Sequence, residues 1–357
     1  MHTGFAIVGG GVNGLMTALA LSEHSNDITV IDAQTTGQGC SWAGGGILSA
    51  LVPWHEHPAN QALCQQGQKM YPQLCAQLRD ETGIDPEYTQ EGMLILDCAE
   101  TDSIAAWCEA NGVNAGIIGH DREDLFPGVR LPDGASSVWL PDVAHVRNPR
   151  LLRALKAALQ KRGVQILEHH RVEALEYYDH RVHCRMDTGN LEAEKAILCN
   201  GVWINELLPE SAHLPMRPMR GQMLCLEDHG FELQSIILNR DCYVIPRRGG
   251  VLLIGSTVED AGFDSGITDT ARRQLLASAE AMIPGLGNQA NVRQWSGLRP
   301  DSMRGYPYIG AISGFDSLYV NAGHFRTGLL AAPASAALLT ALLSGSEPVL
   351  NSAVYEP

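Results

Sequence analysis

The chain has 357 residues, of which 45% are hydrophobic and 18% charged, and its 25 basic and 40 acidic side chains give a formal net charge of −15. This length is enough for a substantial core in two domains or in one elaborated domain. The acidic balance argues against nucleic acids and anionic membrane surfaces as partners.

The start of the chain predicts a βαβ unit. A short apolar run at residues 4–9 is followed by the glycine-rich sequence GGGVNG, by a segment with apolar residues at helical spacing, and by a second apolar run at 27–33. A strand, a helix and a second strand in this order indicate a parallel sheet.

Three glycines in this unit form the pattern G-x-G-x-x-G between the predicted strand and helix. Gly9 allows the tight turn, Gly11 lets the backbone approach a pyrophosphate, and Gly14 lets the helix pack closely on the strand. Asp32, at the end of the second strand, stands where a ribose hydroxyl would be bound. Such a pattern alone can be only a tight turn, but its position favours dinucleotide binding, without choosing between NAD and FAD.

A loop of small residues follows this unit, with the sequence TTGQGCSWAGGGILSA at residues 35–50. A backbone with so few bulky side chains can lie against a flat ring system or phosphates and donate N–H groups to them. The alternative is a flexible linker, although hydroxyl residues and a triple glycine directly after a strand are unusual for one.

The next part of the chain predicts a helix, a strand and a second layer. Residues 59–82 carry an apolar stripe typical of a helix, and residues 91–97 form an apolar run typical of a strand. Residues 100–145 are rich in turn formers, and we expect them to belong to a separate layer.

A helix is predicted at residues 148–163, with Asn148 as its cap, Pro149 in its first turn and Gly163 at its end. Strands that return to the first sheet are expected within 164–172, 180–187 and 190–201.

The last part of the chain predicts antiparallel strands from 221–227 through 242–257, with a hairpin turn at Gly249 and Gly250. A helix near 269–283 follows, and the chain then returns to a glycine-rich turn and an Ala/Leu helix. We therefore expect a discontinuous dinucleotide-binding domain interrupted by a β-rich second domain.

The cysteines and apolar runs indicate an intracellular protein. The nine cysteines are odd in number and none are spaced as CxxC, which argues against a disulfide framework or a zinc site. The segment HEHP at 55–58 has two histidines without a third ligand and is more typical of a solvated turn. No secretory signal opens the chain, and the apolar stretch 329–343 is short for a membrane span. We expect a cytoplasmic protein without a metal.

Sequence stretches along nearly the whole chain resemble the D-amino-acid oxidase superfamily of FAD enzymes and, within it, the glycine oxidases linked to synthesis of the thiamine thiazole. They occur in family order: AIVGGGVNG, CSWAGGGILSA, MRGQML, CYVIPRRGG, IGSTVEDAGFD, WSGLRP, GYPYIG and GHFRTGLLAAPA. WSGLRP followed by GHFRTG is the most specific part.

This resemblance implies an α/β fold with a Rossmann-type FAD-binding domain and a β-rich antiparallel substrate domain. The FAD-binding domain would comprise residues 1–85, 146–220 and 297–357, and the substrate domain residues 86–145 and 221–296.

The resemblance also implies the residues that hold the cofactor, which we expect to be non-covalent FAD. Asp32 departs from the Glu often seen in the family, although the shorter carboxylate can still accept a ribose hydroxyl. Val172 would contact the adenine side through its backbone. The full expected set is Gly9, Gly11, Val12, Asn13, Gly14, Asp32, Ala33, Cys40, Ser41, Gly45, Gly46, Ile47, Val172, His324, Phe325, Arg326, Thr327, Gly328, Leu329 and Leu330.

The turn before the last helix combines glycines with one cation, Arg326. A helix that begins near Gly328 points its positive end at whatever precedes it, and this end would stabilise the negative charge of a reduced flavin. Gly323 and Gly328 would let the backbone come close to the ring. By resemblance, the main-chain oxygen of Arg326 accepts the substrate amine. The alternative for Arg326 is a surface ion pair beside the helix.

Arg299, in WSGLRP, is the strongest candidate for a catalytic-site residue. A substrate carboxylate is planar with two oxygens, and a guanidinium offers a matching pair of donors. Tyr243 would add a hydroxyl donor to the same carboxylate, the alternative being an ordinary core aromatic of a strand. His324 is expected behind the site rather than as a general base, and Cys242 is expected to be a free thiol.

The implied reaction is oxidative deamination of glycine or a small D- or N-methyl amino acid. Hydride would pass from the substrate Cα to flavin N5, the imine would hydrolyse to an oxo acid and ammonia, and oxygen would reoxidise the flavin to give hydrogen peroxide. A sarcosine oxidase, a quinone-linked D-amino-acid dehydrogenase, the flavin domain of a tRNA-modifying enzyme and a non-catalytic flavin-binding protein are alternatives. The acidic balance argues against the tRNA enzyme. The oligomeric state is left open, a homo-oligomer being possible.

Overall fold

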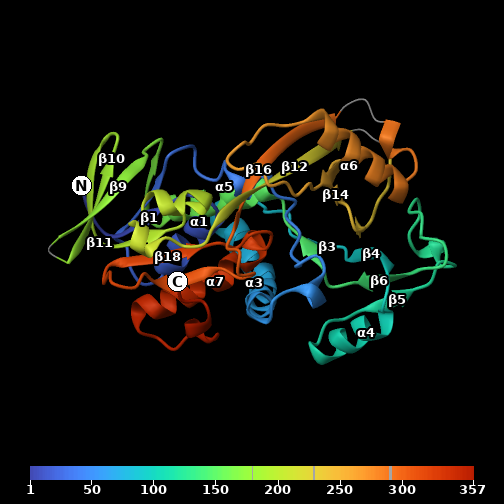
Figure 1. Ribbon diagram of the computed structural model, residues 1–357, viewed down its shortest axis with the longest axis horizontal. Coiled ribbons are helices and arrows are strands. Elements are labelled where there is room, and N and C mark those ends of the chain that lie inside the picture. Colours follow the sequence, from blue (N-terminus) through green and yellow to red (C-terminus); the bar gives the residue numbers. More distant parts are fainter. Residues whose placement is uncertain (179, 228–229, 289–291) are drawn as a thin grey trace.

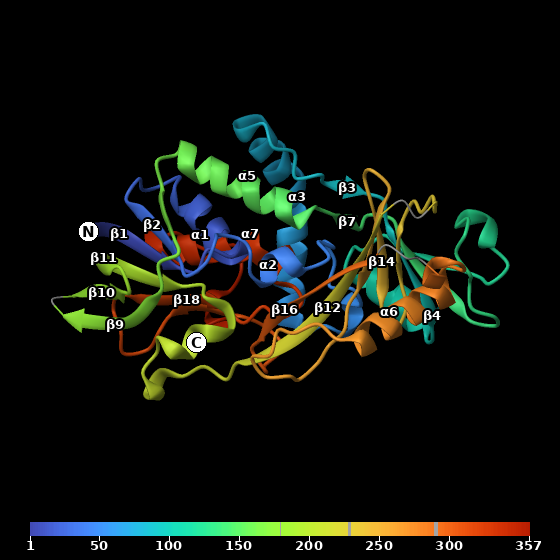
Figure 2. The same ribbon diagram turned by 90° about the horizontal axis from the view of Figure 1, so that it is seen from above.

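Two eight-stranded sheets follow one another along the long axis of the computed structural model (Figure 1, Figure 2). The structure describes residues 1–178, 180–227, 230–288 and 292–357.

The first sheet has a parallel centre and antiparallel margins. The parallel strands, in spatial order, are β8 (Gln165–Glu168), β2 (Ile28–Asp32), β1 (His2–Val8), β11 (Gly189–Leu198) and β18 (Leu318–Ala322). The antiparallel strands are β17 (Tyr308–Ala311), paired with β18, then β10 (Arg181–Met186), paired with β11, and β9 (Val172–Tyr178), paired with β10. The predicted βαβ unit and the returning strands are confirmed.

Four helices cover one face of this sheet (Figure 2). They are α1 (Val12–Leu21), α3 (Pro58–Thr82), α5 (Asn148–Lys161) and α7 (Gly328–Ser344). Helix α7 packs against both α1 and α3. The contact with α3 is so close that a Cβ on Gly67 would lie 2.2 Å from the carbonyl oxygen of Leu330. Tyr71 of α3 also donates a hydrogen bond to the carbonyl of Leu329. The first turn of α7 is therefore fixed by side chains far away in the sequence.

The second sheet is antiparallel except for one parallel pair, β4 with β13. Its order is β16 (Val292–Asp301), β12 (Arg217–Glu227), β15 (Val251–Gly255), β14 (Tyr243–Arg247), β13 (Ile236–Leu238), β4 (Met93–Cys98), β6 (Ser136–Leu140) and β5 (Gly116–Ile118). Arg248, Gly249 and Gly250 join β14 to β15, and the two glycines have left-handed φ of +81° and +68°, which suits a hairpin turn. The predicted hairpin and the helix α6 (Asp269–Met282) are confirmed.

The description of residues 100–145 as rich in turns was incomplete. This region contains the helix α4 (Thr101–Ala110) as well as β5 and β6, which join the second sheet. Only Ile104 and Cys108 of α4 are buried, so the helix has too narrow an apolar stripe to be recognised by its periodicity.

The role predicted for Asn148 was wrong. Arg147 occupies the N-cap position of α5, and the Asn148 side chain instead donates to the carbonyl oxygens of Ser41 and Gly44, at 2.8 and 3.0 Å. Its amide serves a loop more than a hundred positions earlier in the chain rather than its own helix.

The remaining elements are short. They are α2 (Cys40–Ala43), the strand pair β3 (Thr89–Gln90) and β7 (Ala144–His145), and the 3₁₀ helices η1 (Pro53–His55), η2 (Glu123–Leu125), η3 (Gly201–Glu206), η4 (Glu210–Ala212), η5 (Leu286–Asn288) and η6 (Ser352–Val354). His57, in the segment HEHP, caps α3 by accepting from the N–H of Ala59. Within the described ranges, no helix is both long and apolar enough to cross a membrane. The predicted domain limits are not tested and stay a prediction. The limit between residues 220 and 221 falls inside β12, and the limit between residues 296 and 297 falls inside β16.

Candidate active site

A cavity of about 910 Å³ is lined by the strand ends of the first sheet and by strands of the second. Gly14, Thr327 and Leu330, which the sequence placed at the cofactor, do not contribute to its lining. The predicted residues that line it are Gly9, Gly11, Val12, Asn13, Asp32, Ala33, Cys40, Ser41, Gly45, Gly46, Ile47, Val172, Tyr243, Arg299, His324, Phe325, Arg326, Gly328 and Leu329.

The three glycines of the fingerprint have different roles in the structure. A Cβ on Gly9 would lie 2.5 Å from the carbonyl oxygen of Cys199, and a Cβ on Gly14 would lie 1.9 Å from that of Gly9. These two glycines are therefore required by the packing of β1, α1 and β11. A Cβ on Gly11 would meet only the Ser41 hydroxyl, at 3.2 Å, and its φ of −72° suits any residue. Gly11 is the one of the three whose missing side chain leaves room in the cavity.

The N-terminus of α1 is available to an anion. Its N-cap is Gly11, which has no side chain to cap the helix, and no acidic residue lies in the first turn. One N–H, that of Val12, is satisfied by the Ser41 hydroxyl at 2.9 Å. The unsatisfied donors and the helix dipole together favour a phosphate here.

Asp32 lies at the end of β2 on the same wall. Its Oδ2 accepts from the N–H of Gly10 and its Oδ1 from the N–H of Gln34, each at 2.8 Å. Burial raises the pKa of this carboxyl above its ordinary value, against the effect of the two N–H donors. The two backbone bonds fix the carboxylate in place, and its remaining lone pairs can accept a sugar hydroxyl.

Five carbonyl groups of the loop from Ser41 to Ile47 accept hydrogen bonds from outside the loop, three of them from residues that do not line the cavity. The Ser41 and Gly44 oxygens accept from the side-chain amide of Asn148. The Ala43 oxygen accepts from the indole N–H of Trp295 at 2.9 Å, and the Gly45 oxygen accepts from the guanidinium of Arg247. The Gly46 oxygen accepts from the backbone N–H of Val146 at 2.9 Å.

A trans peptide unit points its C=O and its N–H in opposite directions. The carbonyl contacts therefore turn the N–H groups of Gly44, Gly45, Gly46 and Ile47 toward the cavity that these residues line. None of these N–H groups has an acceptor among the described residues, although Gly45 and Gly46 are buried. Buried N–H groups are almost always paired, so the N–H groups of Gly45 and Gly46 indicate a bound acceptor.

These observations fit FAD. The α1 N-terminus suits the pyrophosphate, Asp32 suits the ribose, and the row of N–H donors at Gly44–Ile47, of which Gly45 and Gly46 are buried, suits the polar edge of a flat ring. The cavity volume lies near the top of the range of about 300–1,000 Å³ that is usual for ligand sites.

Helix α7 presents a second uncapped N-terminus to the cavity. Thr327, at its N-cap, directs its hydroxyl to Asn60 and to the carbonyl of His324 rather than to the helix, and no acidic residue lies in the first turn. Gly328 and Leu329 line the cavity. Gly323 was expected to let the backbone approach the ring, but the structure needs a glycine here for another reason. Its φ is +85°, and a Cβ there would lie 2.9 Å from Ser302 rather than in the cavity.

His324 is a buried neutral ring that joins three elements. Burial lowers its pKa to about 3. Its Nδ1 lies 3.4 Å from the Asn13 side-chain amide and its Nε2 lies 2.9 Å from the Ser335 hydroxyl. Both ring nitrogens are thus engaged, which agrees with the expectation that His324 supports the site rather than acting as a base.

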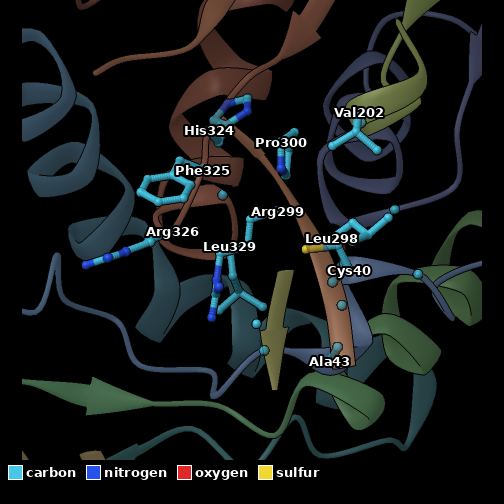
Figure 3. Close-up of a pocket in the computed structure, with 18 of the residues that line it drawn as sticks. Cys40, Ala43, Val202, Leu298, Arg299, Pro300, His324, Phe325, Arg326 and Leu329 are labelled. Atoms are coloured by element: carbon cyan, nitrogen blue, oxygen red, sulfur yellow. The ribbon is translucent and has the colours of Figure 1, made fainter. Parts of the chain in front are cut away.

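The turn before α7 is attached to the strand that carries Arg299. The N–H of Phe325 donates to the Pro300 carbonyl at 2.8 Å, and His324 forms a β-bridge with Asp301. Phe325 adopts a left-handed φ of +49°, which is costly for a bulky residue. Figure 3 shows Arg299 and the turn His324–Phe325–Arg326 meeting at one end of the cavity.

Arg299 has part of its guanidinium committed to the protein. Nη1 donates to the carbonyls of Thr257 (3.0 Å) and Arg220 (3.4 Å), and Nη2 donates to the Ser256 hydroxyl at 2.6 Å. A guanidinium has five N–H donors. Nε–H and one Nη2–H therefore have no acceptor among the described residues, and Nε and Nη2 form the edge of the guanidinium that can bind a carboxylate side-on with two bonds.

Tyr243 and Arg326 complete this end of the cavity. The Tyr243 hydroxyl lies 3.3 Å from the Met223 sulfur, a weak acceptor, and the residue is 8% exposed. The Arg326 side chain is exposed, lies over the Phe325 ring at 5.0 Å, and points away from Arg299 in Figure 3. The Arg326 carbonyl accepts no hydrogen bond from the described residues.

Sequence reasoning assigned no part in the cavity to several residues that shape it. Asn148, Arg247 and Trp295 bind the carbonyls of the Ser41–Ile47 loop, and Ser256 and Thr257 hold Arg299. The one available signal was Arg247 itself, a charged residue at the end of the apolar run YVIP, where a buried strand would not be expected to place a cation.

Comparison with known proteins agrees with this geometry. The family model for FAD dependent oxidoreductases, DAO, matches residues 5–342. A glycine oxidase of Pseudomonas aeruginosa is 40% identical, with 98% of this chain and 97% of that protein covered. The bifunctional protein ThiO/ThiG of Nostoc sp. is 30% identical over 99% of this chain and 55% of its own length. The crystal structure of glycine oxidase from Geobacillus kaustophilus superposes with a TM-score of 0.93 at 25% identity, covering 99% and 98% of the two chains.

Proposed function

Because the chain belongs to the family of FAD dependent oxidoreductases, we propose that it is an FAD-dependent oxidase that deaminates glycine or another small amino acid. Similarity to glycine oxidases at 40% identity over nearly the full chain supports this substrate class. The single observation that carries the proposal is the free donor pair of Arg299, which lies in the same cavity as the two uncapped helix N-termini.

The substrate carboxylate binds to Nε and Nη2 of Arg299, with the Tyr243 hydroxyl as a further donor. A carboxylate is a far better acceptor for this hydroxyl than the thioether of Met223. The Arg326 carbonyl accepts from the substrate amine. Two anchors at the carboxylate and one at the amine orient the substrate Cα toward the cofactor wall of the cavity.

FAD, when bound, supplies the acceptor for the hydride that leaves the substrate Cα, and oxygen regenerates it with formation of hydrogen peroxide. The substrate amine must be neutral in this step. His324 cannot take that proton, because both of its ring nitrogens are engaged inside the protein. The chain therefore binds and orients the substrate without a side-chain base, and the imine product hydrolyses to an oxo acid and ammonia.

The cofactor is held without a covalent bond. Cys242 borders the cavity but is 3% exposed, and burial raises the pKa of its thiol to about 11. A protonated, buried thiol is a poor nucleophile. The resemblance to the ThiO/ThiG protein supports a role in thiamine synthesis. A cytoplasmic location and a homo-oligomeric state stay predictions.

Anaerobic reduction of the bound flavin by a panel of glycine, sarcosine, D-alanine and D-proline tests this function. We expect bleaching of the visible flavin absorbance by glycine, and peroxide release when oxygen is admitted. Bleaching by sarcosine or D-proline alone would move the assignment to those substrates. A flavin that is reduced by none of the four would overturn the proposal.

A further inference from the structure

Arg247 is a buried cation that the reaction described above does not use. It ends β14, is 9% exposed, and has no carboxylate within 4.0 Å among the described residues. Its Nε also has no hydrogen-bond partner there. Removing a cation from water without pairing it is expensive, so a protein keeps one in such a place where it has a task.

The guanidinium of Arg247 makes two hydrogen bonds. Nη2 donates to the Gly45 carbonyl, and Nη1 donates to Nδ1 of His145. His145 is 2% exposed, and burial together with the neighbouring Arg247 lowers its pKa to about 3. Its ring is therefore neutral and can accept. The imidazole fixes the guanidinium, which in turn fixes the carbonyl.

The Gly45 carbonyl and the Gly46 N–H belong to one planar peptide unit, so a bond to the carbonyl orients the N–H on the opposite side. Gly46 has φ of +75°, and a Cβ there would lie 2.9 Å from Nη2 of Arg247 and 2.1 Å from the Val146 carbonyl. The loop is thus pressed against Arg247 on one side and open to the cavity on the other. The Gly46 N–H is one of the unpaired buried donors described above.

We infer that Arg247 is a positioning residue for the cofactor: through the Gly45 carbonyl it directs the Gly46 N–H into the cavity, where that N–H donates to the bound flavin. This inference rests on the proposed function, since it needs FAD in the cavity. Asn148 and Trp295 hold the adjacent carbonyls in the same way, so Arg247 is one of three side chains that together shape the row of donors.

The next residue supplies a matched control. Arg248 has the same charge, but its side chain is 58% exposed and pairs with Asp85 at 3.0 Å on the surface. Substitution of Arg248 removes an equal charge close by without touching the Ser41–Ile47 loop.

The experiment uses the full chain stripped of FAD and titrated with FAD, for wild type, Arg247→Met, Arg247→Lys and Arg248→Met. Fluorescence quenching gives the dissociation constant, and the visible spectrum reports the surroundings of the ring. We expect Arg247→Met to weaken FAD binding about 10- to 100-fold and to shift the spectrum, since a hydrogen bond from a charged group is lost and one N–H is no longer held. Arg247→Lys should fall between, because lysine keeps the charge but cannot bind Gly45 and His145 together. Arg248→Met should match wild type.

A merely structural role has a different signature. It would lower the melting temperature of the stripped protein in the Arg247 variants while leaving the dissociation constant and spectrum of the folded fraction as in wild type, and this result would overturn the inference. If Arg247→Met does not fold, Arg247→Lys decides by the same two measurements. A wild-type chain that binds no FAD would instead refute the proposed function, so the two failures are distinguishable.

Discussion

The two walls of the cavity use different kinds of donor. The cofactor wall consists of the first turns of α1 and α7 and the Ser41–Ile47 loop, and it presents backbone N–H groups. The substrate wall consists of Arg299 and Tyr243 on the second sheet, and it presents side-chain donors. Backbone donors cannot be deleted by truncating a side chain, whereas each side-chain donor can. Adding a side chain to the cofactor wall should therefore abolish binding, whereas removing one of the side chains that hold its carbonyls should only weaken it. The substrate wall should fail when one of its own side chains is removed.

Gly11→Val gives the largest expected effect. A Cβ at this position would meet only the Ser41 hydroxyl within the protein, so the chain should fold, but the valine side chain fills the space at the α1 N-terminus. We expect a folded protein without FAD and with activity at background level. The measurement is the ratio of flavin to protein absorbance beside the melting temperature of the stripped chains. Normal FAD content in this variant would show that the glycine fingerprint does not bind the cofactor.

Arg299→Ala tests the substrate wall. It leaves the carboxylate without its two-bond partner, and the expected loss of about 2–5 kcal/mol corresponds to a fall of roughly 30- to several-thousand-fold in kcat/KM. Arg299→Lys should restore part of the loss because it keeps the charge but not the paired donors. FAD content should stay as in wild type. Steady-state peroxide release with glycine measures the effect, and an unchanged kcat/KM would place the carboxylate elsewhere.

Tyr243→Phe removes one hydroxyl from the same wall. Its present neighbour, the Met223 sulfur, is only a weak acceptor, so little stability depends on the hydroxyl. A lost hydrogen bond to a charged group should lower kcat/KM for glycine about 10- to 100-fold, with FAD content unchanged. Equal kinetics for the two proteins would mean that Tyr243 is only a core aromatic.

Glu259→Gln sharpens the comparison, because Glu259 acts on Arg299 through Thr257. Its carboxylate accepts from Arg220, Gln222 and Thr257, and the Thr257 carbonyl accepts from Arg299. The amide keeps the shape but weakens these bonds, and we expect KM for glycine to rise about 2- to 10-fold with kcat little changed.

Asp264→Asn is the control for Glu259→Gln. Asp264 also pairs with Arg220, at 2.6 Å, but its side chain is 65% exposed and has no bond to Thr257. An equal rise in KM for both variants would show that the charge of Arg220 matters rather than the position of Arg299.

The local sequence determined the elements that depend on neighbours in the chain. The fingerprint glycines between β1 and α1 and the hairpin at Gly249 and Gly250 both follow from backbone preferences within a few residues. Family resemblance then identified Arg299 and Tyr243 as cavity residues, and the structure does bring both into the lining of one cavity with the fingerprint.

Only the tertiary structure decided what holds the cofactor wall in shape. Asn148 was predicted to cap a helix but binds Gly44, while Arg247 and Trp295, which had no predicted role, bind Gly45 and Ala43. The three pairs are separated by 104, 202 and 252 positions. Local pattern reports which backbone groups a segment can pair within itself. It does not say which donors from outside will bind the carbonyls of a loop, because those donors reach the loop only once α5 and the second sheet have packed against it.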